Sequence, residues 1–183
     1  DPLSGLVANF AAPSVCAGSP TMFFDTSTPL GNILNWGWDF DNNGTVDDIT
    51  QNPSHTFPGP GTYNVELWVK GVGGCVDSIV IAVVVNPNPV ANFTGTNECF
   101  GGTTTFNDLS NVLTGTITNW FWDFGDPNVT SDTSILQNPT YTYTAPGSYN
   151  VTLTVTSDSG CTGTIIIPIQ VYSNPVANFT PNV

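Results

Sequence analysis

The chain has 183 residues, of which 14 are acidic, one is a lysine (Lys70) and one is a histidine (His55), so its formal net charge is −13. A single basic residue cannot neutralise a phosphate backbone, which excludes nucleic-acid binding, and no apolar run reaches the roughly 18 residues of a membrane span, which excludes insertion into a membrane. The residues are 39% hydrophobic, and Thr, Asn, Gly and Pro are abundant where helix formers are scarce. This composition favours strands and turns, so we expect an all-β protein.

The same pattern is written twice along the chain and begun a third time. The shared segments are Val-Ala-Asn-Phe (7–10, 90–93 and 176–179), Trp-x-Trp-Asp-Phe (36–40 and 120–124), Gln-Asn-Pro (51–53 and 137–139) and Pro-Gly-x-Tyr-Asn-Val (60–65 and 146–151). Such repetition is typical of an array of similar domains. We predict domains at 1–87 and 88–174, and we read 175–183 as the start of a third repeat in a longer array. The alternative is that this tail is a free strand that pairs with the sheet edge of a neighbouring chain.

Period-two alternation predicts the strands within each repeat. In the first repeat, every second residue from Leu34 to Phe40 is apolar, and the same holds from Tyr63 to Val69. We expect the last strand of this repeat to run from about Val76 to Val85. Its continuous apolar run, from Ile79 to Val85, predicts burial on both sides or a place at the sheet centre. The second repeat shows the same order at 120–124, 149–155 and 165–171. About seven short strands per repeat predict two tandem immunoglobulin-like β-sandwiches, with proline-containing, semi-rigid linkers between repeats.

Four cysteines occupy equivalent positions in the two repeats, and three pairings are open to them. The repeat symmetry favours Cys16–Cys75 and Cys99–Cys161, each closing a loop of about 60 residues and stabilising the fold by roughly 4 kcal/mol. A metal site is a poor alternative, because no close Cys-x-x-Cys pair or neighbouring His is present. Disulfides indicate an extracellular location.

An acidic loop after the first Trp-Asp-Phe strand is the strongest candidate for a site. The candidate ligands are Asp39, Asp41, Asn43, the Thr45 carbonyl and Asp47. Oxygen donors at alternate positions around a glycine are typical of calcium loops, although Thr50 stands where a bidentate Glu is expected. The alternative is that these Asx residues only cap strands. The second repeat departs further, keeping Asp123, Asp126 and Asp132. Calcium is the one cofactor that we expect.

The shared motifs resemble those of the PKD (polycystic kidney disease) domain. A Trp-Asp-Phe strand, an Asn-Pro dipeptide and then Pro-Gly-x-Tyr-x-Val-x-Leu-x-Val occur in both repeats, at 38–69 and 122–155. The cysteine-containing version is similar to PKD repeats of large cell-surface and adhesin proteins of Bacteroidetes. The resemblance implies an extracellular β-sandwich that acts as a spacer or adhesion module without catalytic activity. It also implies that Ser78, in Asp77-Ser78-Ile79, is a candidate for O-glycosylation.

His55 and Trp68 are considered both as structural residues and as functional ones. His55 is the only imidazole, so no Ser/His/Asp set can be built, and its counterpart in the second repeat is Tyr141; we expect both to lie at the core edge. Trp68 lies on the polar-facing side of its strand and could stack on a sugar or a partner, or pack between domains.

We therefore expect a structural spacer or stalk segment of a large extracellular repeat protein, a surface adhesin or filament. Its main partners would be the neighbouring repeats. The alternative is an ancillary module that attaches a secreted hydrolase or an adhesin to a polysaccharide or a surface protein.

Overall fold

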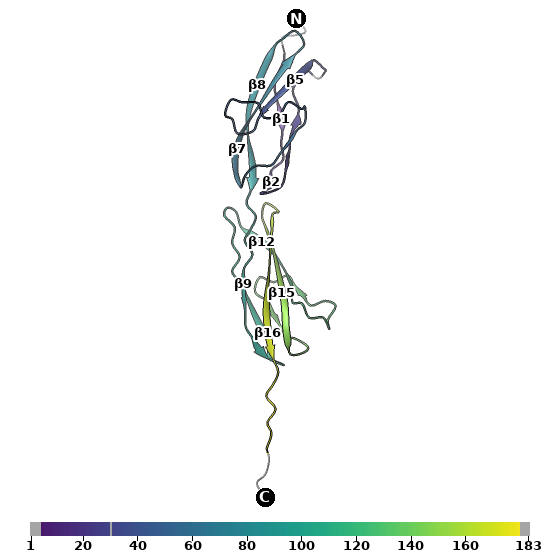
Figure 1. Ribbon diagram of the computed structural model, residues 1–183, viewed down its shortest axis with the longest axis vertical. Helices are drawn as coiled ribbons and strands as arrows, with labels where there is room; N and C mark the ends of the chain where they lie inside the picture. Colours follow the sequence, from purple (N-terminus) through teal and green to yellow (C-terminus); the bar gives the residue numbers. More distant parts are fainter. Residues whose placement is uncertain (1–4, 30, 180–183) are drawn as a thin grey trace. The chain divides into compact units, whose positions relative to one another are not determined.

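The computed structural model describes residues 5–29 and 31–179. These residues form strands, turns and irregular segments without a helix, so none of them lies in a helix able to cross a membrane. The chain divides into two compact units, Asp1–Pro87 and Asn88–Val183 (Figure 1). The described residues from 173 to 179 form no strand, and residues 180–183 of the predicted third repeat lie outside the described part. The all-β prediction is confirmed.

The two units contain similar successions of strands, except that β3 and β4 of unit 1 correspond to the single strand β11 of unit 2 and that β13 has no counterpart strand in unit 1. Unit 1 has β1 (Phe10–Ala11), β2 (Val15–Cys16), β3 (Thr21–Met22), β4 (Phe24–Asp25), β5 (Ile33–Asp39), β6 (Ser54–His55), β7 (Gly61–Gly71) and β8 (Val76–Asn86). Unit 2 has β9 (Phe93–Gly95), β10 (Glu98–Cys99), β11 (Thr104–Asp108), β12 (Ile117–Asp123), β13 (Thr133–Ser134), β14 (Thr140–Tyr141), β15 (Gly147–Ser157) and β16 (Thr162–Tyr172).

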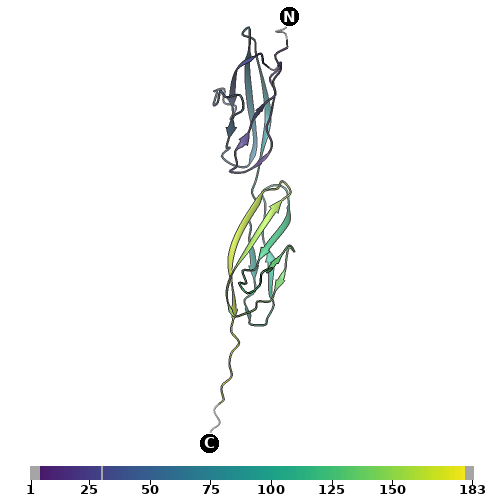
Figure 2. The same cartoon turned by 90° about the vertical axis from the view of Figure 1, so that its right-hand side faces the viewer.

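The main sheet of each unit is built on a long antiparallel hairpin. In unit 1 the strand order is β2-β8-β7-β5, and in unit 2 it is β10-β16-β15-β12-β13. The shorter strands pair as β1-β4 and β3-β6 in unit 1, and as β14-β11-β9 in unit 2. Core side chains from both groups of strands pack together, so each unit is an immunoglobulin-like sandwich with its own core (Figure 2).

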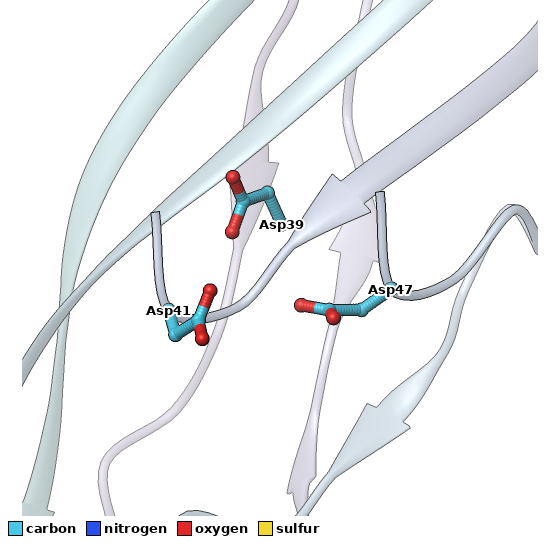
Figure 3. Close-up of side chains that lie close together, drawn as sticks. All are labelled: Asp39, Asp41 and Asp47. Carbon is cyan, nitrogen blue, oxygen red and sulfur yellow. The ribbon is translucent and has the colours of Figure 1, made fainter. Parts of the chain in front are cut away.

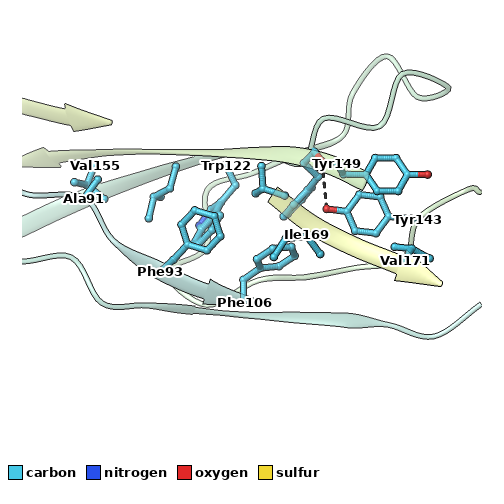
Figure 4. Packing of buried hydrophobic residues seen from close by; sticks show 12 residues of the cluster. Ala91, Phe93, Phe106, Trp122, Tyr143, Tyr149, Val155, Ile169 and Val171 are labelled. Atoms are coloured by element: carbon cyan, nitrogen blue, oxygen red, sulfur yellow. Dashed lines mark hydrogen bonds between the residues drawn. The ribbon is translucent and has the colours of Figure 1, made fainter. Parts of the chain in front are cut away.

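An aromatic cluster fills the core of each sandwich. In unit 2, Trp122 is fully buried, with its ring 5.0 Å from that of Phe93 and 5.4 Å from that of Phe106 (Figure 4). In unit 1, Trp38 is likewise fully buried and lies 5.1 Å from Phe10. Large rings bury much apolar area and prefer such tilted and edge contacts. The repeated Trp-Asp-Phe motif therefore supplies the centre of each core.

Each sandwich has a tyrosine corner. The hydroxyl of Tyr63 donates to the Gly59 carbonyl at 2.9 Å, and that of Tyr149 donates to the Ala145 carbonyl at 2.6 Å. Each tyrosine thus ties the Pro-Gly turn to the start of the strand that follows it.

The predicted strand face is wrong at Leu34, and of the two alternatives for the last strand the structure has the place inside the sheet. The register between β5 and β7 shifts between Ile33 and Asn35, and this irregularity turns Leu34 to solvent, where it is 59% exposed. Strand β8 does lie inside its sheet, between β2 and β7. However, Val80 and Val84 are 49% and 44% exposed, so β8 is buried on one face and not on both.

The predicted pairing of the cysteines is also wrong. Cys16 and Cys161 are disulfide-bonded, whereas Cys75 and Cys99 carry free thiols. The physical reason is strand length. Cys16 pairs with Asn86 at the last residue of β8, while Cys75 directly precedes the first. Eleven residues of strand separate the two ends by about 33 Å, far beyond the Cα separation that a disulfide spans.

Unit 2 repeats this arrangement. Cys99 pairs with Tyr172 at the end of β16, while Cys161 directly precedes its first residue. The cysteine positions are set by the parallel pairing of a two-residue strand with the last strand of the unit, and this pairing cannot be predicted from the sequence.

Candidate functional site

The loop from Asp39 to Asp48 in unit 1 brings three carboxylates together. Asp39 is the last residue of β5 and is only 5% exposed, whereas Asp41 and Asp47 lie on the exposed loop. One carboxylate oxygen from each residue lies within 4.8 Å of the others, and the three groups converge on one point (Figure 3). Three of the five predicted ligands are therefore neighbours in space.

Backbone amides hold this loop in shape. The Asp39 carboxylate accepts hydrogen bonds from the N–H groups of Asn43 at 3.1 Å and Gly44 at 2.7 Å. Asp47 accepts one from the Phe40 N–H at 2.8 Å. The turn needs left-handed backbone at Asn42 (φ 55°) and Gly44 (φ 87°), which are residue types that tolerate it. The Asx-turn alternative is thus present in the structure, and it preorganises the same oxygens that would face a cation.

The electrostatics of Asp39 favour its ionised form. Burial raises the pKa of its carboxyl, but hydrogen bonds from the backbone N–H groups of Gly44 and Asn43 outweigh burial and lower the pKa below its ordinary value. Asp39 also pairs in register with Glu66 on β7, an acid that the sequence reasoning missed. The chain's only lysine, Lys70, pairs with Val76 at the far end of the hairpin. The described part of the chain therefore offers these carboxylates no lysine or arginine as a counter-ion.

The other two predicted ligands are engaged with each other. The Asn43 side-chain oxygen accepts a hydrogen bond from the Thr45 N–H at 2.8 Å and a second from the Thr45 hydroxyl. This contact holds Thr45 beside the acidic cluster. Coordination by Asn43 and by the Thr45 carbonyl stays a prediction.

In unit 2 the corresponding acids hydrogen-bond to backbone N–H groups of the same unit. Asp126 is 2% exposed and accepts hydrogen bonds from the N–H groups of Thr144 at 3.0 Å and Asn128 at 3.1 Å. Asp132 accepts one from the Asp126 N–H at 2.6 Å, and Asp123 accepts one from the Gly125 N–H at 2.9 Å. No triad of carboxylates like that of unit 1 forms among the described residues of unit 2.

Trp68 is half-buried and lies beside the acidic loop. It lines a shallow cavity of about 280 Å³ together with Gly37, Val46, Glu66 and Asp39. A Cβ on Gly37 would meet the Trp68 ring at 3.4 Å and Val46 at 3.2 Å, so the glycine leaves room for both side chains beside β5. Ligand stacking on Trp68 stays a prediction.

The structure also places the other candidates. Ser78 is exposed and pairs in register with Trp68 on the neighbouring strand, so its hydroxyl is accessible; its glycosylation stays a prediction. His55 stacks on Phe40 at 4.3 Å, and its counterpart Tyr141 stacks on Phe124 at 4.4 Å. Both rings lie at the edge of the core, as predicted.

Comparison with known proteins identifies the repeats. The PKD domain family matches residues 7–85 and 86–171. The metalloprotease PrtV precursor of Vibrio cholerae is 46% identical over 46 residues, which are 25% of this chain and 5% of that protein. The chain thus spans only a small part of that relative.

Solved structures of single PKD domains are similar as well. The PKD1 domain of Vibrio anguillarum Epp is 32% identical and covers 49% of this chain and 99% of its own (TM-score 0.44). The PKD1 domain of Vibrio cholerae PrtV is 38% identical and covers 46% of this chain and 98% of its own (TM-score 0.41). Since the family match extends over most of the chain, as two consecutive copies, this chain belongs to the PKD domain family.

Proposed function

We propose that the two PKD domains act as a spacer segment of a large extracellular repeat protein, a surface stalk or adhesin, and not as an enzyme. The observation that carries the proposal is where the chain enters and leaves each unit. In unit 1, Leu6 lies against Gly71 at the end of β7, while the chain leaves at Asn86, the end of β8. The length of β8, about 33 Å, therefore separates the two points. Each added domain of this design adds length.

The strand pairing suits a part that is pulled at its ends. Strand β2 near the N-terminus runs parallel to the C-terminal strand β8, with Val15 opposite Val85. Tension along the chain draws these two strands past each other, so their hydrogen bonds are loaded together in shear and not opened one by one. Strands β10 and β16 repeat the arrangement, with Glu98 opposite Val171. Family membership and the disulfide-bonded cysteines support an extracellular location.

Single-molecule pulling of the chain under reducing conditions tests this proposal. We expect two unfolding events, one for each unit. Val15→Pro removes a backbone donor from β2 and should lower the unfolding force of unit 1 only, so that unit 2 serves as the control within the same molecule. An unchanged force for unit 1 contradicts the shear arrangement.

The second candidate function is an ancillary binding module for a polysaccharide or a surface protein. The half-buried Trp68 beside a shallow acidic cavity favours it, because an aromatic ring offers a stacking platform. Pull-down on insoluble cellulose, chitin and collagen distinguishes the two functions. Binding that Trp68→Ala abolishes, and that Phe121→Ala in unit 2 retains, supports the module. No binding by the unaltered chain supports the spacer.

We also propose that the loop from Asp39 to Asp47 binds calcium. All its candidate ligand atoms are oxygens, as calcium prefers, and a divalent cation would offset the repulsion among three neighbouring carboxylates. Bound calcium would stiffen the loop between the end of β5 and the residue that pairs back with that strand, Asp48 opposite Trp38.

A further inference from the structure

Each free thiol of this chain stands at a repeat position whose counterpart is disulfide-bonded. Cys99 in the second repeat corresponds to Cys16 in the first, and Cys75 in the first corresponds to Cys161 in the second. Cys16 and Cys161 are bonded, whereas Cys75 and Cys99 are exposed free thiols. Both cysteine positions of the repeat are therefore positions at which a disulfide forms.

The two positions lie at opposite ends of a unit. Cys99 pairs with Tyr172, where the chain leaves unit 2. Cys75 lies in the turn between β7 and β8, where its carbonyl accepts the Gly71 N–H at 2.9 Å, and this is the end at which the chain enters unit 1. Because a strand of about 33 Å separates the two ends of a unit, neither thiol can bond the other cysteine position of its own domain. The partner must come from another domain.

The charges beside the two thiols differ. Lys70 pairs with Val76, the residue after Cys75, so the chain's only lysine lies close to that thiol. Asp77 lies close by as well; its carboxylate accepts the Ala8 N–H at 2.8 Å and keeps the negative charge that offsets Lys70. Cys99 instead follows the exposed acid Glu98 directly. Two Cys99 ends bring two Glu98 carboxylates together and repel each other, whereas Lys70 offsets Asp77 at a Cys75 end, so a Cys75 end and a Cys99 end meet with less repulsion.

We propose that Cys75 of one copy of this repeat pair and Cys99 of another form a disulfide that joins the copies end to end. The oxidant is a small-molecule disulfide such as oxidised glutathione. The Cys75 thiolate attacks one of its sulfurs and releases one glutathione thiolate, leaving a mixed disulfide. The Cys99 thiolate of the second copy then attacks the Cys75 sulfur and releases the second glutathione thiolate. Two protein thiols lose two protons and two electrons, and one small disulfide becomes two thiols.

The test uses two single variants of the full chain, Cys75→Ser and Cys99→Ser, incubated in a glutathione redox buffer and separated without reductant. Each variant alone is expected to stay monomeric. An equal mixture should give a dimer of twice the chain mass, and mass spectrometry should find a peptide that links Cys75 to Cys99. The unaltered chain, which carries both thiols, should give a ladder of longer oligomers. The double variant is the control.

Two outcomes overturn the proposal. One is homodimers of either single variant in the same yield as the mixed dimer, which means unselective oxidation. The other is a mixture that yields only glutathione adducts. Both cysteines are exposed, so the serine variants should keep the melting temperature of the parent, and this measurement excludes misfolding. The proposal extends the spacer function, but the two are tested separately, because the pulling experiment is done under reducing conditions.

Discussion

Trp36 donates its indole N–H to a carboxylate oxygen of Asp25 at 2.8 Å, and Trp120 donates to Asp108 in the same way at 2.7 Å. The side-chain amide of Gln51 donates to that same oxygen of Asp25 at 3.2 Å. The Gln-Asn-Pro motif, which recurs in both repeats, is thus explained. In each unit the glutamine of this motif and the first Trp of the Trp-x-Trp strand donate hydrogen bonds to the same partly buried aspartate.

Replacement of Asp108 by alanine should destabilise unit 2 by about 2 kcal/mol, because it leaves several donors without their charged acceptor. Those donors are the Ser110 N–H at 2.9 Å, the Trp120 indole at 2.7 Å and the Gln137 amide at 3.1 Å. Asp123→Ala is the matched control, since this exposed carboxylate accepts only the Gly125 N–H among the described contacts. Chemical denaturation measures both, and equal losses contradict the assignment.

The carboxylates of Asp25 and Asp108 also make the folding stability depend on pH in the acidic range. Burial raises the pKa values of Asp25 and Asp108, but hydrogen bonds from Ser27 and Ser110, and from the neighbouring Trp and Gln side chains, lower both below the ordinary value. The stability that these groups contribute is fully present above about pH 4, the ordinary value for aspartate. It is lost as the pH falls through the lower pKa of the folded state.

Melting temperatures measured from pH 7 down to pH 2 should therefore fall most steeply below about pH 4. In Asp25→Asn and Asp108→Asn the decline should be shallower, because the titrating group is gone. A decline of the same steepness in these variants contradicts this source of the pH dependence.

High pH should lower the folding stability of unit 2 more than that of unit 1. Burial and the charges of Asp126 and Asp132 raise the pKa of Tyr141 to about 12, and burial likewise raises the pKa of Tyr143. Their stabilising contribution is fully present below pH 10, the ordinary value for tyrosine. It is lost as the pH rises through about 12, because the unfolded chain ionises first. His55 and Phe57 stand at these positions in unit 1.

Hydrogen exchange followed by mass spectrometry reports each unit separately between pH 9 and 12. Peptides of unit 2 should lose protection at lower pH than those of unit 1. Tyr143→Phe should cost about 1 kcal/mol at neutral pH, since the hydroxyl donates to the Phe124 carbonyl at 3.2 Å, but it should raise the pH at which unit 2 opens. Simultaneous opening of both units in the parent chain contradicts this prediction.

The sequence could predict the repeat, the long strands and the aromatic core, because alternation over several residues fixes which face of a strand is buried. Val65, Leu67 and Val69 are fully buried, as the period-two pattern requires. The exposure of Leu34 could not be predicted, because the register shift before it depends on pairing with β7 and not on local composition. The free state of Cys75 depends likewise on where the two-residue strand β2 pairs.

The acidic loop was predictable for a different reason. Oxygen donors closely spaced in sequence around Gly44 must lie near one another whatever the rest of the fold does, and the convergence of Asp39, Asp41 and Asp47 follows. Glu66, far away in sequence, joins them only through the register of β5 and β7, which no local pattern reveals.

A buried hydroxyl in each unit offers a stabilising substitution. The side-chain oxygens of Thr21 and Thr104 are fully buried and have no hydrogen-bond partner. Valine has the same shape without the polar atom, so Thr104→Val should remove the cost of desolvating the hydroxyl and stabilise unit 2 by about 1 kcal/mol. Thr103→Val, at an exposed residue whose hydroxyl contacts Thr142, is the control. A fall in stability for Thr104→Val contradicts the absence of a partner.

Calcium should stabilise unit 1 through the cluster of Asp39, Asp41 and Asp47. A ligand that binds only the folded state at ten times its Kd adds about 1.4 kcal/mol, which raises Tm by about 4–8 °C per kcal/mol in a domain of this size. We expect a rise in Tm with millimolar calcium that EDTA reverses. Asp41→Ala and Asp47→Ala should abolish the rise, while Asp123→Ala, at the position in unit 2 that corresponds to Asp39, should keep it. If both loop variants respond to calcium as the parent does, the cation binds elsewhere and the loop is an Asx turn alone.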